Sequence, residues 1–556
     1  MKQLKTILLI FLISLFGGGG TYAQLPGTPY IVPTYYAEEN LCTGFNTLGR
    51  DFWVTFGHNY TYTAANVFFA LNIAANLDTD VTLTFKETGQ VAQYHITGGT
   101  VHQIDLSKVQ GNVPPNNTNL GDMRASVYLY TAGTLPVSSI SGRNNKSLHI
   151  ESTMPVSVYA FNTGTTSTDA TILIPTQTWG RDYYRLSYQP YHIAGQSGGD
   201  NRDIELIIAK EDDTELFLDG AITPFAVIDA GEVYYLYGGQ DIDLTGRHIT
   251  SGKPVGYFTH SQLVFIPKGL RAGDILLEQL SPVNQWGTKF LVPNVPEEVL
   301  NNTNILTDEL NHIRILASQD NTTVTYFGAT LRTTDFNNQD ISGDTPILSG
   351  QTLDRGQWVE LEIDGDRTTD HLSSCYITTN KPVGVTAYLI GSGGDGLPSV
   401  IQQVGDPSIS RIPSIEQSLT NVLIAPFMFQ PGVNNPYTVL DGIAPSSPGP
   451  VNPIVTHYAI IITPTASKGS ASMTSNGSPV VLDPNQWVDN IASTEGGTQP
   501  GFSYYIHTFD NVNDYGKSFI VSNSDEGAGV IVLAAGMSRW ESYYYNAGSG
   551  ACVINP

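Results

Sequence analysis

The sequence is poor in cysteine and in basic residues, and each shortage excludes a class of protein. It has three cysteines in 556 residues and no Cys-x-x-Cys spacing, which excludes a zinc framework or a dense disulfide scaffold. Lys and Arg number 26 against 51 Asp and Glu, and the formal net charge is −25. Because nucleic acids and anionic membrane surfaces bind clusters of Lys and Arg, we expect neither as a partner.

Apolar runs long enough to cross a bilayer are also lacking. The most apolar stretch, residues 7–16, follows Lys2 and Lys5 and is followed by small residues up to Ala23. This arrangement is typical of a secretory signal peptide, which we place at residues 1–23. The mature chain is therefore expected to be secreted or held at the cell surface, without a segment inserted in the membrane.

The positions of the cysteines suggest one disulfide. Cys42 precedes the first regular segment and Cys552 follows the last, so a bond between them would join the two ends of the folded chain. An exported protein folds in an oxidising environment, where such pairing is expected. Cys375 lies in a strand-like apolar segment, where a buried small residue is the ordinary explanation. Cys42 and Cys552 are therefore the disulfide candidate.

Short motifs recur along the chain at intervals of about 125 residues, which is the mark of a repeat protein. One motif is a strand entered from a turn, and its equivalent positions are Gly99, Gly231, Gly356 and Asn485. Four tandem pseudo-repeats are therefore predicted, the fourth of them degraded. The predicted segments are 24–47 (N-terminal extension), 48–178, 179–285, 286–417 and 418–540 (repeats) and 541–556 (C-terminal tail).

A second recurring motif contains a Pro-Val pair. It reads HIESTMPVSVYAF from His149, HITSGKPVGYF from His248 and YITTNKPVGVTAY from Tyr376. The Ser-Gly-Lys run before Pro254 predicts a tight turn, and the proline is expected at the first position of the following strand, where its missing N–H is tolerated. Because the motif occurs in several repeats, it is predicted to be structural.

The composition favours strands throughout. Val, Ile, Thr and Tyr are abundant, apolar and polar residues alternate, and helical periodicity is almost absent, so the fold class is predicted to be all-β. Units of this length have the size of antiparallel β-sandwich domains. The alternative is a propeller-like closed ring, because SRWESYYYN at Ser538 is similar to the WGRDYY opening of the second repeat, as though a further unit began there.

Candidate catalytic groups are few. GQSGG around Ser197 is similar to the nucleophile segment of chymotrypsin-like proteases, but Gln196 replaces the acidic residue before the serine, and no matching His segment lies upstream. A carboxylate pair for glycosidic cleavage is assembled in space, and nothing in the sequence points to a particular pair. No catalytic residue is therefore predicted.

Candidate metal ligands are also few. His95 and His102 flank Gly98 and Gly99, and a two-residue hairpin turn would place the two imidazoles opposite each other. No third ligand is identifiable, so a solvated pair is favoured over a metal site. Acidic loops such as GGQDIDLTG, from Gly238, lack the spacing of a known calcium loop. No metal site and no cofactor is predicted, and Ca²⁺ is the alternative.

Several aromatic residues occupy equivalent positions in different repeats. Trp179 aligns with Trp286, and His149 aligns with His248. An active site rarely needs the same residue in every copy, whereas a repeated core does. These side chains are therefore expected to pack between units and not to bind a ligand.

Three stretches of the sequence together resemble the N-terminal domain of the IgGFc-binding protein family. They are LTGRHITSGKPVGYF from Leu244, GDILLEQLSPVNQWGTKFLVPNV from Gly273 and ASQDNTTVTYFG from Ala317. The resemblance extends from residue 48 to residue 330 and fades through the fourth repeat. It implies an extracellular recognition or adhesion module and implies no catalytic residue.

The same family includes an animal mucus protein and many secreted bacterial proteins. The short signal ending in Ala-Gln is similar to those of Bacteroidota, so a bacterial member is expected. The chain differs from the animal protein in having no cysteine-rich von Willebrand type D modules. Antibody binding and mucin assembly therefore do not follow from the resemblance.

These observations together predict a secreted, non-enzymatic protein that binds an extracellular glycoprotein, glycan or cell-surface protein through its loops. One alternative is an extracellular glycan-active hydrolase, and another is a structural surface or matrix protein that self-associates. A single deep acidic cleft with two converging carboxylates would favour the hydrolase, whereas shallow, loop-lined surfaces would favour a binding module.

Overall fold

The structure is a computed structural model. It describes residues 46–59, 67–114, 118–128, 141–164, 167–191, 201–239, 242–268, 273–298, 306–308, 311–333, 350–363, 373–391, 405–428, 456–490, 501–510, 513–537, 542–551 and 554. All of these residues belong to one compact unit, Ala37–Asn555. The signal peptide predicted at 1–23 and the disulfide candidate Cys42 and Cys552 lie outside the described residues, and both stay predictions.

Each of three large antiparallel sheets is built around one long strand: β9 (Leu148–Thr163), β16 (His248–Val264) or β26 (Ser374–Leu389). The first half of β9 pairs with β1 and β3, and its second half pairs with β2 and β10. Because the long strand changes partners midway, each sheet curls around its own apolar side chains. The all-β class predicted from the sequence is confirmed.

The first sheet has the order β4-β3-β9-β2-β5, with β1 and β10 also paired to β9. A two-stranded sheet of β6 (Val109–Gln110) and β7 (Asn119–Gly121) and the short 3-10 helix η1 (Arg124–Ser126) follow β5. The strands of the first sheet besides β9 are β1 (Gly49–Val54), β2 (Phe68–Ala75), β3 (Thr79–Phe85), β4 (Val91–Ile96), β5 (Thr100–Asp105) and β10 (Thr168–Ile172).

The second sheet has the order β14-β13-β16-β12-β15-β8, with β11 and β17 also paired to β16. Its edge strand β8 (Ser141–Asn144) comes from the part of the chain that precedes β9, so the first two units interlock. The other strands are β11 (Gly180–Tyr184), β12 (Asp203–Ala209), β13 (Thr214–Leu218), β14 (Ala226–Ile228), β15 (Val233–Tyr237) and β17 (Asp274–Leu280).

The third sheet has the order β23-β25-β21-β26-β22-β24, with β18 and β27 also paired to β26. A separate pair, β19 (Pro296–Glu298) and β20 (Leu306–Asp308), follows β18. The remaining strands of the third sheet are β18 (Gly287–Pro293), β21 (His312–Ala317), β22 (Thr322–Phe327), β23 (Ala329–Leu331), β24 (Thr352–Leu353), β25 (Trp358–Ile363) and β27 (Ser408–Arg411).

Two smaller sheets complete the unit, with the orders β28-β34-β30-β31 and β32-β33-β29-β35-β36. The place of a long strand is taken by two shorter ones, β34 (Phe519–Asn523) and β35 (Ile531–Met537), so the sheet is divided where SNSDEGAG interrupts the chain. Their partners are β28 (Asn421–Ile424), β29 (Thr456–Pro464), β30 (Ala471–Ser475), β31 (Ser478–Val480), β32 (Val488–Asp489), β33 (Phe502–Thr508) and β36 (Ser542–Gly548).

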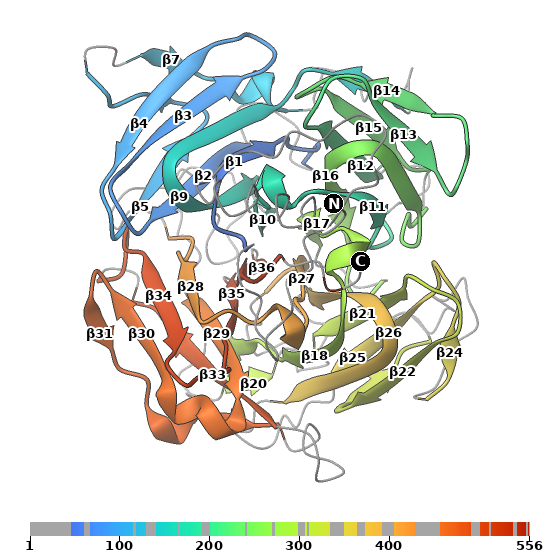
Figure 1. Ribbon diagram of the computed structural model, residues 1–556, viewed down its shortest axis with the longest axis vertical. Coiled ribbons are helices and arrows are strands. Elements are labelled where there is room, and N and C mark those ends of the chain that lie inside the picture. The colour runs from blue at the N-terminus through green and yellow to red at the C-terminus, as the bar shows by residue number, and fades with distance from the viewer. Residues whose placement is uncertain are drawn as a thin grey trace, which may run out of the picture. The chain divides into compact units, whose positions relative to one another are not determined.

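The sheets are arranged in a ring, with strands β10, β17, β27 and β36 nearest its centre (Figure 1). These inner strands contact one another in turn, and β36 contacts β10 to complete the circle. Hydrophobic cores are shared in the same cyclic way: the first sheet packs on the second, the second on the third, the third on the fourth pair of sheets, and that pair on the first. This arrangement of the units corresponds to the propeller-like closed ring that was the alternative in the sequence analysis.

The ring is closed by residues from the two ends of the described chain. Asn46 forms a β-bridge with Gly550, and the Thr47 N–H donates to the carbonyl of Ser549 at 3.1 Å. The hydroxyl of Tyr159, in β9, donates to the carbonyl of Ala547, in β36, at 2.8 Å. The first and last sheets are therefore joined by backbone and side-chain hydrogen bonds as well as by a shared core.

The Pro-Val motif does not form the turn predicted for it. His248–Val264 is one continuous strand, and Pro254 lies within it. The extra residues form a bulge in β16: Gly180 and Asp182 of β11 lie opposite Val255 and Thr250, so the missing N–H of the proline falls where the ladder is interrupted. The long strands β9 and β26 have the same bulge before Val156 and Val383, which shows that the motif marks the bend of each long strand.

The segment 541–556, predicted as a tail, contains β36. This strand pairs with β35 as β10 pairs with β9 and β17 with β16, so it is an inner strand of the ring. The interpretation of SRWESYYYN as the opening strand of a further unit is therefore wrong, because the opening strands β1 and β11 pair with the other half of their long strands. The repeat boundaries themselves stay a prediction.

Two glycines in the long strands make room for the repeated tryptophans. A Cβ atom on Gly256 would lie 2.6 Å from the Trp179 ring, and one on Gly384 would lie 2.7 Å from the Trp286 ring. Both tryptophans are buried, and each indole N–H donates to a carbonyl five residues earlier, of Ile174 or Ser281. The prediction that these tryptophans are packing residues is confirmed.

Substitution of Gly256 by Ala is expected to lower the free energy of unfolding by about 1–3 kcal/mol, because the added methyl group must displace a buried indole. Urea unfolding of residues 24–556, followed by tryptophan fluorescence, measures the change. Gly469→Ala is the matched control, since a Cβ atom there meets no atom within 4 Å. Equal stability of the two variants would contradict this account of the Gly256 and Trp179 contact.

Candidate functional site

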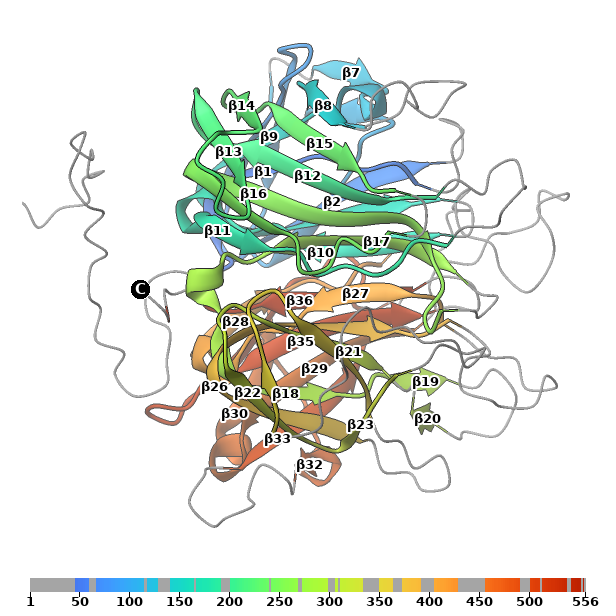
Figure 2. The same ribbon diagram turned by 90° about the vertical axis from the view of Figure 1, so that its right-hand side faces the viewer.

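The four inner strands begin at one end of the ring, and several connections between strands leave the sheets there. Thr168 and Phe68 both lie opposite Thr163, at the end of β9, and Asp274 lies opposite Val264, at the end of β16. Ser408 and Ser542 have the same places beside the ends of β26 and β35. We call this side of the ring the connection end; the strands that lead to it run side by side in Figure 2.

Carboxyl groups meet at the centre of the connection end. Asp169, in β10, accepts hydrogen bonds from the Ser408 hydroxyl at 2.7 Å and from the Leu277 N–H at 2.8 Å. Asp274, in β17, accepts one from the Thr168 N–H at 2.9 Å. These bonds connect three of the four inner strands, so the carboxyl groups hold the centre of the ring together.

Burial changes the protonation of this central group. It raises the pKa of Asp169, Asp274 and Asp406 well above the ordinary range of a carboxyl group, and the repulsion between Asp274 and Asp406 raises it further. Glu278, in β17, is fully buried, accepts from the Thr171 hydroxyl at 3.1 Å and has its pKa raised by burial to about 8. At neutral pH Glu278 is therefore largely protonated.

A buried arginine joins the second and third sheets. Arg314, in β21, donates from Nη1 to the carbonyl of Ser187 at 2.6 Å and to Asp243 at 2.6 Å, and from Nε to Glu360 at 2.9 Å. Its guanidinium carbon lies 4.2 Å from the centre of the Tyr188 ring and 4.1 Å from that of Trp358. Charge, hydrogen bonds and cation–π contacts therefore all act across this boundary.

The partner carboxylate of Arg314 stays ionised. Burial would raise the pKa of Glu360, but Arg314 and His312 outweigh it and lower the pKa to about 2. His312 Nδ1 lies 3.1 Å from Glu360, and the hydroxyl of Tyr188 donates to the same carboxylate at 3.2 Å. Arg314 is only 3% exposed and Glu360 only 2%, so neither side chain can contact a macromolecular partner. Their bonds instead stabilise the ring.

A second buried arginine lies within the second sheet. Arg185 follows β11, is fully buried and pairs with Asp203, and it also donates to the carbonyl of Ile204 at 2.8 Å. Asp203 further accepts from the Ser187 hydroxyl at 2.7 Å and from the Leu244 N–H at 2.9 Å. Every oxygen of this carboxylate is therefore used, and the pair fixes the start of β12.

Two buried histidines connect the first and second sheets. His260 Nε2, in β16, donates to the carbonyl of His58 at 2.9 Å, and Gln262 contacts the His58 ring. Burial lowers the pKa of both histidines to about 4, so both rings are neutral at physiological pH. Gly57 is required beside them, because a Cβ atom there would lie 2.3 Å from the His260 ring.

An aromatic pair is only half-buried at the connection end. The rings of Tyr191 and Phe265 lie 3.8 Å apart, and both side chains are partly exposed. Pro190 forms a β-bridge with Val264, and the Tyr191 N–H donates to the carbonyl of Leu263 at 2.8 Å, so the pair is fixed to the end of β16. Aromatic side chains held in this way are suited to contact a protein or sugar surface.

The residues considered as metal ligands have other partners. His95 and His102 do not face each other, because β4 pairs with β3 and β5 pairs with β2, at opposite edges of the first sheet. His95 Nδ1 lies 2.8 Å from Asp80, and the His102 ring lies 5.3 Å from the Tyr94 ring. The predicted hairpin at Gly98 and Gly99 is therefore wrong.

The repeated histidines are structural, as predicted. His149 stacks on Trp53 with ring centres 4.2 Å apart, and His248 stacks on Tyr184 at the same separation. His248 Nε2 also lies 2.7 Å from Asp182. Ser197 lies outside the described residues.

Two further observations concern metals and membranes. Over the described ranges, the side chains of His, Cys, Asp and Glu form no group of three or more that could hold a metal ion. Among the same residues, no helix has the length and hydropathy needed to cross a membrane. Cys375 is fully buried in β26, as predicted for it.

The buried charges were not predicted as a group. Arg185 and Arg314 are each a single charge within an otherwise uncharged stretch, YYRLSY after β11 and HIRILA in β21, and that isolated charge is the signal that could have identified them. Their partners Asp203 and Glu360 are distant in sequence and show no such signal. The structure therefore separates a buried charged scaffold from the partly exposed aromatic pair at the connection end.

Comparison with known families agrees with these observations. The family model described as IgGFc binding protein matches residues 39–237 and again residues 169–534, and the two overlapping matches fit a chain with internal repeats. A comparison with curated protein sequences gives no match. Because the matched residues make up well over half of the sequence, the chain belongs to the IgGFc binding protein family.

Proposed function

We propose that the protein is an extracellular binding or adhesion protein, and that its partner is a glycoprotein, a glycan or a cell-surface protein. The membership of a family named for binding supports a binding role. We further propose that the partner meets the connection end of the ring. Neither catalysis nor a cofactor is part of this proposal.

The observation that carries the proposal is that the sheets are repeated, whereas the segments that connect their strands differ from one repeat to the next. Equivalent opening and second strands are joined by segments of unlike sequence, which are 55–67, 185–202, 294–311 and 425–455; two of them have equal length and the other two differ. A rigid scaffold that presents variable connections at one end is the usual arrangement of a recognition surface. The buried ion pairs keep the strand ends fixed, so the contacts are positioned in advance.

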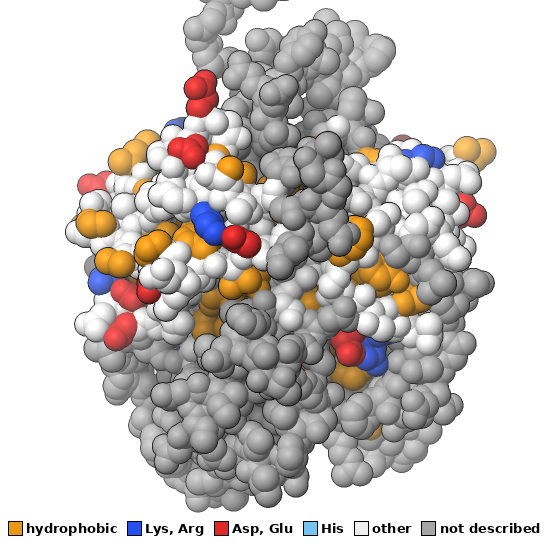
Figure 3. Space-filling view, turned by 90° about the horizontal axis from the view of Figure 1, so that it is seen from below, with side chains coloured by type: hydrophobic (Ala, Val, Ile, Leu, Met, Phe, Trp, Pro, Cys, Tyr) orange, Lys and Arg blue, Asp and Glu red, His pale blue; other side chains and the backbone are white. Residues whose placement is uncertain are grey.

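The exposed surface fits recognition by polar and aromatic groups more than by charge. On the flank of the ring seen in Figure 3, the acidic and basic side chains that are coloured are few and lie among uncharged ones. Charged residues make up 14% of the sequence and aromatic residues 10%. The proposal therefore does not include strong electrostatic steering of a basic partner. It includes direct contacts of aromatic and amide groups.

The proposal is tested by screening residues 24–556 on an array of glycans and mucins that includes immunoglobulin Fc. Saturable binding to one class is expected, without change of the bound molecule. Alanine at Tyr191 or Phe265 is then expected to weaken that binding about tenfold or more, as for an aromatic contact near the centre of an interface.

The control is Ile222→Ser, since Ile222 is 97% exposed and follows β13 near the opposite end of β16. It is expected to leave binding unchanged. Release of sugar from a glycan on the array would contradict a non-enzymatic role. Unaltered affinity in both alanine variants, with binding lost in Ile222→Ser, would place the contact at the opposite end of the ring.

A further inference from the structure

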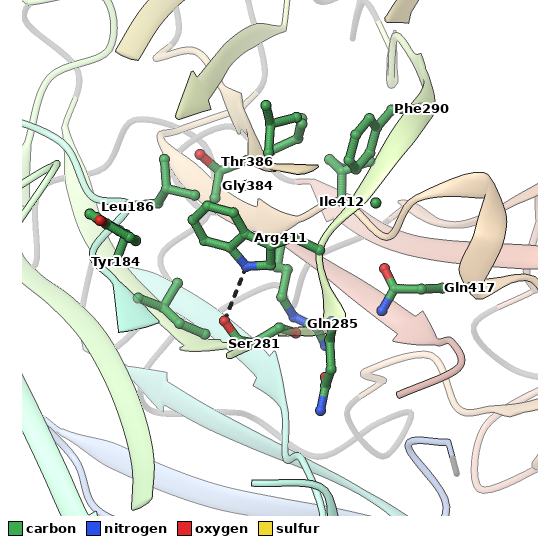
Figure 4. Close-up of a pocket in the computed structure, with 15 residues that line it drawn as sticks. Tyr184, Leu186, Ser281, Gln285, Phe290, Gly384, Thr386, Arg411, Ile412 and Gln417 are labelled. Carbon is green, nitrogen blue, oxygen red and sulfur yellow. Dashed lines mark hydrogen bonds between the residues drawn. The ribbon is translucent and has the colours of Figure 1, made fainter. Parts of the chain in front are cut away.

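A pocket lies between the second and third sheets, away from the aromatic pair (Figure 4). Its walls include the apolar side chains of Leu186, Leu280, Trp286 and Ile412. Ser281 and Arg411 are among its polar lining residues, from the ends of β17 and β27. The cavity volume is about 20 Å³, so the pocket has room only for a molecule of a few atoms. The pocket therefore combines an apolar wall with hydrogen-bond donors.

The donors in this pocket are buried and unused. Arg411 is 7% exposed and Ser281 is 5% exposed. Neither Nε nor Nη2 of Arg411 has a hydrogen-bond partner in the described part of the chain, and the same holds for the Ser281 hydroxyl. A buried guanidinium with free donors costs free energy unless a ligand or water completes its bonds. Arg185 and Arg314, by contrast, form close ion pairs, with Asp203 and with Asp243 and Glu360.

The nearest carboxyl group does not supply the missing bonds. Glu278 Oε1 lies 3.5 Å from Arg411 Nε, within the distance of an ion pair but without a hydrogen bond between the two atoms. Burial raises the pKa of Glu278 to about 8, so near neutral pH this group is largely protonated. The positive charge of Arg411 is then without a balancing negative charge, and an anion entering the pocket would provide one.

We propose that this pocket binds a small carboxylate, held by the Arg411 guanidinium and the Ser281 hydroxyl. A planar carboxylate matches the fork of N–H groups on arginine. The short aliphatic part of such a ligand would lie against Trp286 and Leu280. Because the pocket lies on the boundary between two sheets, an occupied pocket joins the second and third units more firmly. This inference does not depend on the proposed function.

Acetate is the probe for this site, and acetamide is its uncharged counterpart of nearly the same shape. With residues 24–556 at pH 6.5 and constant ionic strength, the relaxation of ¹³C-acetate in NMR is expected to show saturable binding, and that of ¹³C-acetamide is expected to show none. The melting temperature is expected to rise with acetate over the same concentration range, because the ligand binds the folded state.

Two variants locate the binding. Arg411→Gln is expected to weaken acetate binding about tenfold or more, and Ser281→Ala about threefold to tenfold. If Arg411→Gln does not fold, Ser281→Ala decides alone, since it removes one hydroxyl only. Binding of acetate that is equal in the wild type and in Ser281→Ala would overturn the proposal, as would equal binding of acetate and acetamide. Displacement of acetate by chloride would show that the site accepts anions of either kind.

Discussion

Substitution of Arg314 by Met is expected to lower the free energy of unfolding by about 3–5 kcal/mol, the largest effect of any single change considered for this protein. The change leaves Glu360 ionised and buried without its main partner, and it removes the bonds to Ser187 and Asp243 that join the second and third sheets. Methionine keeps most of the side-chain volume, so lost packing contributes little. Urea unfolding at pH 7 measures the change.

Two variants show whether the loss comes from the unpaired carboxylate. Arg314→Met combined with Glu360→Gln is expected to recover part of the stability, because no uncompensated charge then remains. Arg143→Met is the control, since Arg143 is exposed and makes a hydrogen bond to the carbonyl of Val227. It is expected to change stability by about 0.5 kcal/mol or less. A loss below about 1 kcal/mol for Arg314→Met would contradict this interpretation.

Between pH 6.5 and about 8, the free energy of unfolding is expected to fall as the pH rises. Glu278 has a raised pKa, about 8, when folded, so across this range the folded state binds more protons than the unfolded state. Stability then decreases by up to about 1.4 kcal/mol per pH unit for each such group. Burial also raises the pKa values of Asp169, Asp274 and Asp406, so each of them lowers stability as the pH rises through its own folded-state pKa.

Below pH 6.5, groups whose pKa is lowered by folding act in the opposite direction and make the free energy of unfolding fall as the pH falls. His58 and His260 have their pKa lowered to about 4 by burial, so they destabilise the folded state as the pH falls from 6.5 to 4. Glu360 and Glu362, with pKa lowered to about 2, add a loss at still lower pH. Glu278 opposes the two histidines between about pH 4.5 and 6.5, because its raised pKa already favours the folded state at the acid end of that range.

Glu278→Gln is the variant that tests the expected fall in the free energy of unfolding between pH 6.5 and 8. It is expected to reduce the slope of stability against pH between 6.5 and 8 and to be at least as stable as the wild type at pH 8. Chemical unfolding at four pH values across the range measures both. A wild-type stability that is constant or rises from pH 6.5 to 8 would be inconsistent with protonated carboxyl groups at the centre of the ring.

Local patterns in the sequence were sufficient for the strand content and for the equivalence of residues between repeats. Alternation predicted the half-buried strands such as β3 and β4, and the recurrence of His149 and His248 correctly indicated a structural role. Ser251 to Lys253 were read as a turn because glycine and proline usually interrupt a strand. In the structure, these residues form a bulge within the continuous strand β16, and the pairing with β11 that produces it is not visible in one sequence.

Contacts between distant residues were the part that could not be predicted. The Gly98–Gly99 pair has the local signature of a hairpin, but the Gly98 N–H donates to Asp78 and β5 joins the far edge of the sheet. Likewise, Arg314 and Asp243 come from different sheets and meet only after the ring is assembled. The candidate contact of Tyr191 with Phe265 has the same character, since a β-bridge to β16 brings the two rings together.

The bridge between Asn46 and Gly550 has a mechanical consequence when the chain is loaded through these two positions. Neighbouring strands are about 4.8 Å apart, so a load applied through these two positions is carried across the closure and bypasses most of the ring. A chain pulled at these two positions would gain almost no length from the ring until the bridge between Asn46 and Gly550 opens. Once it parts, the first and last sheets can separate and the chain lengthens, so this junction sets the force at which the protein yields.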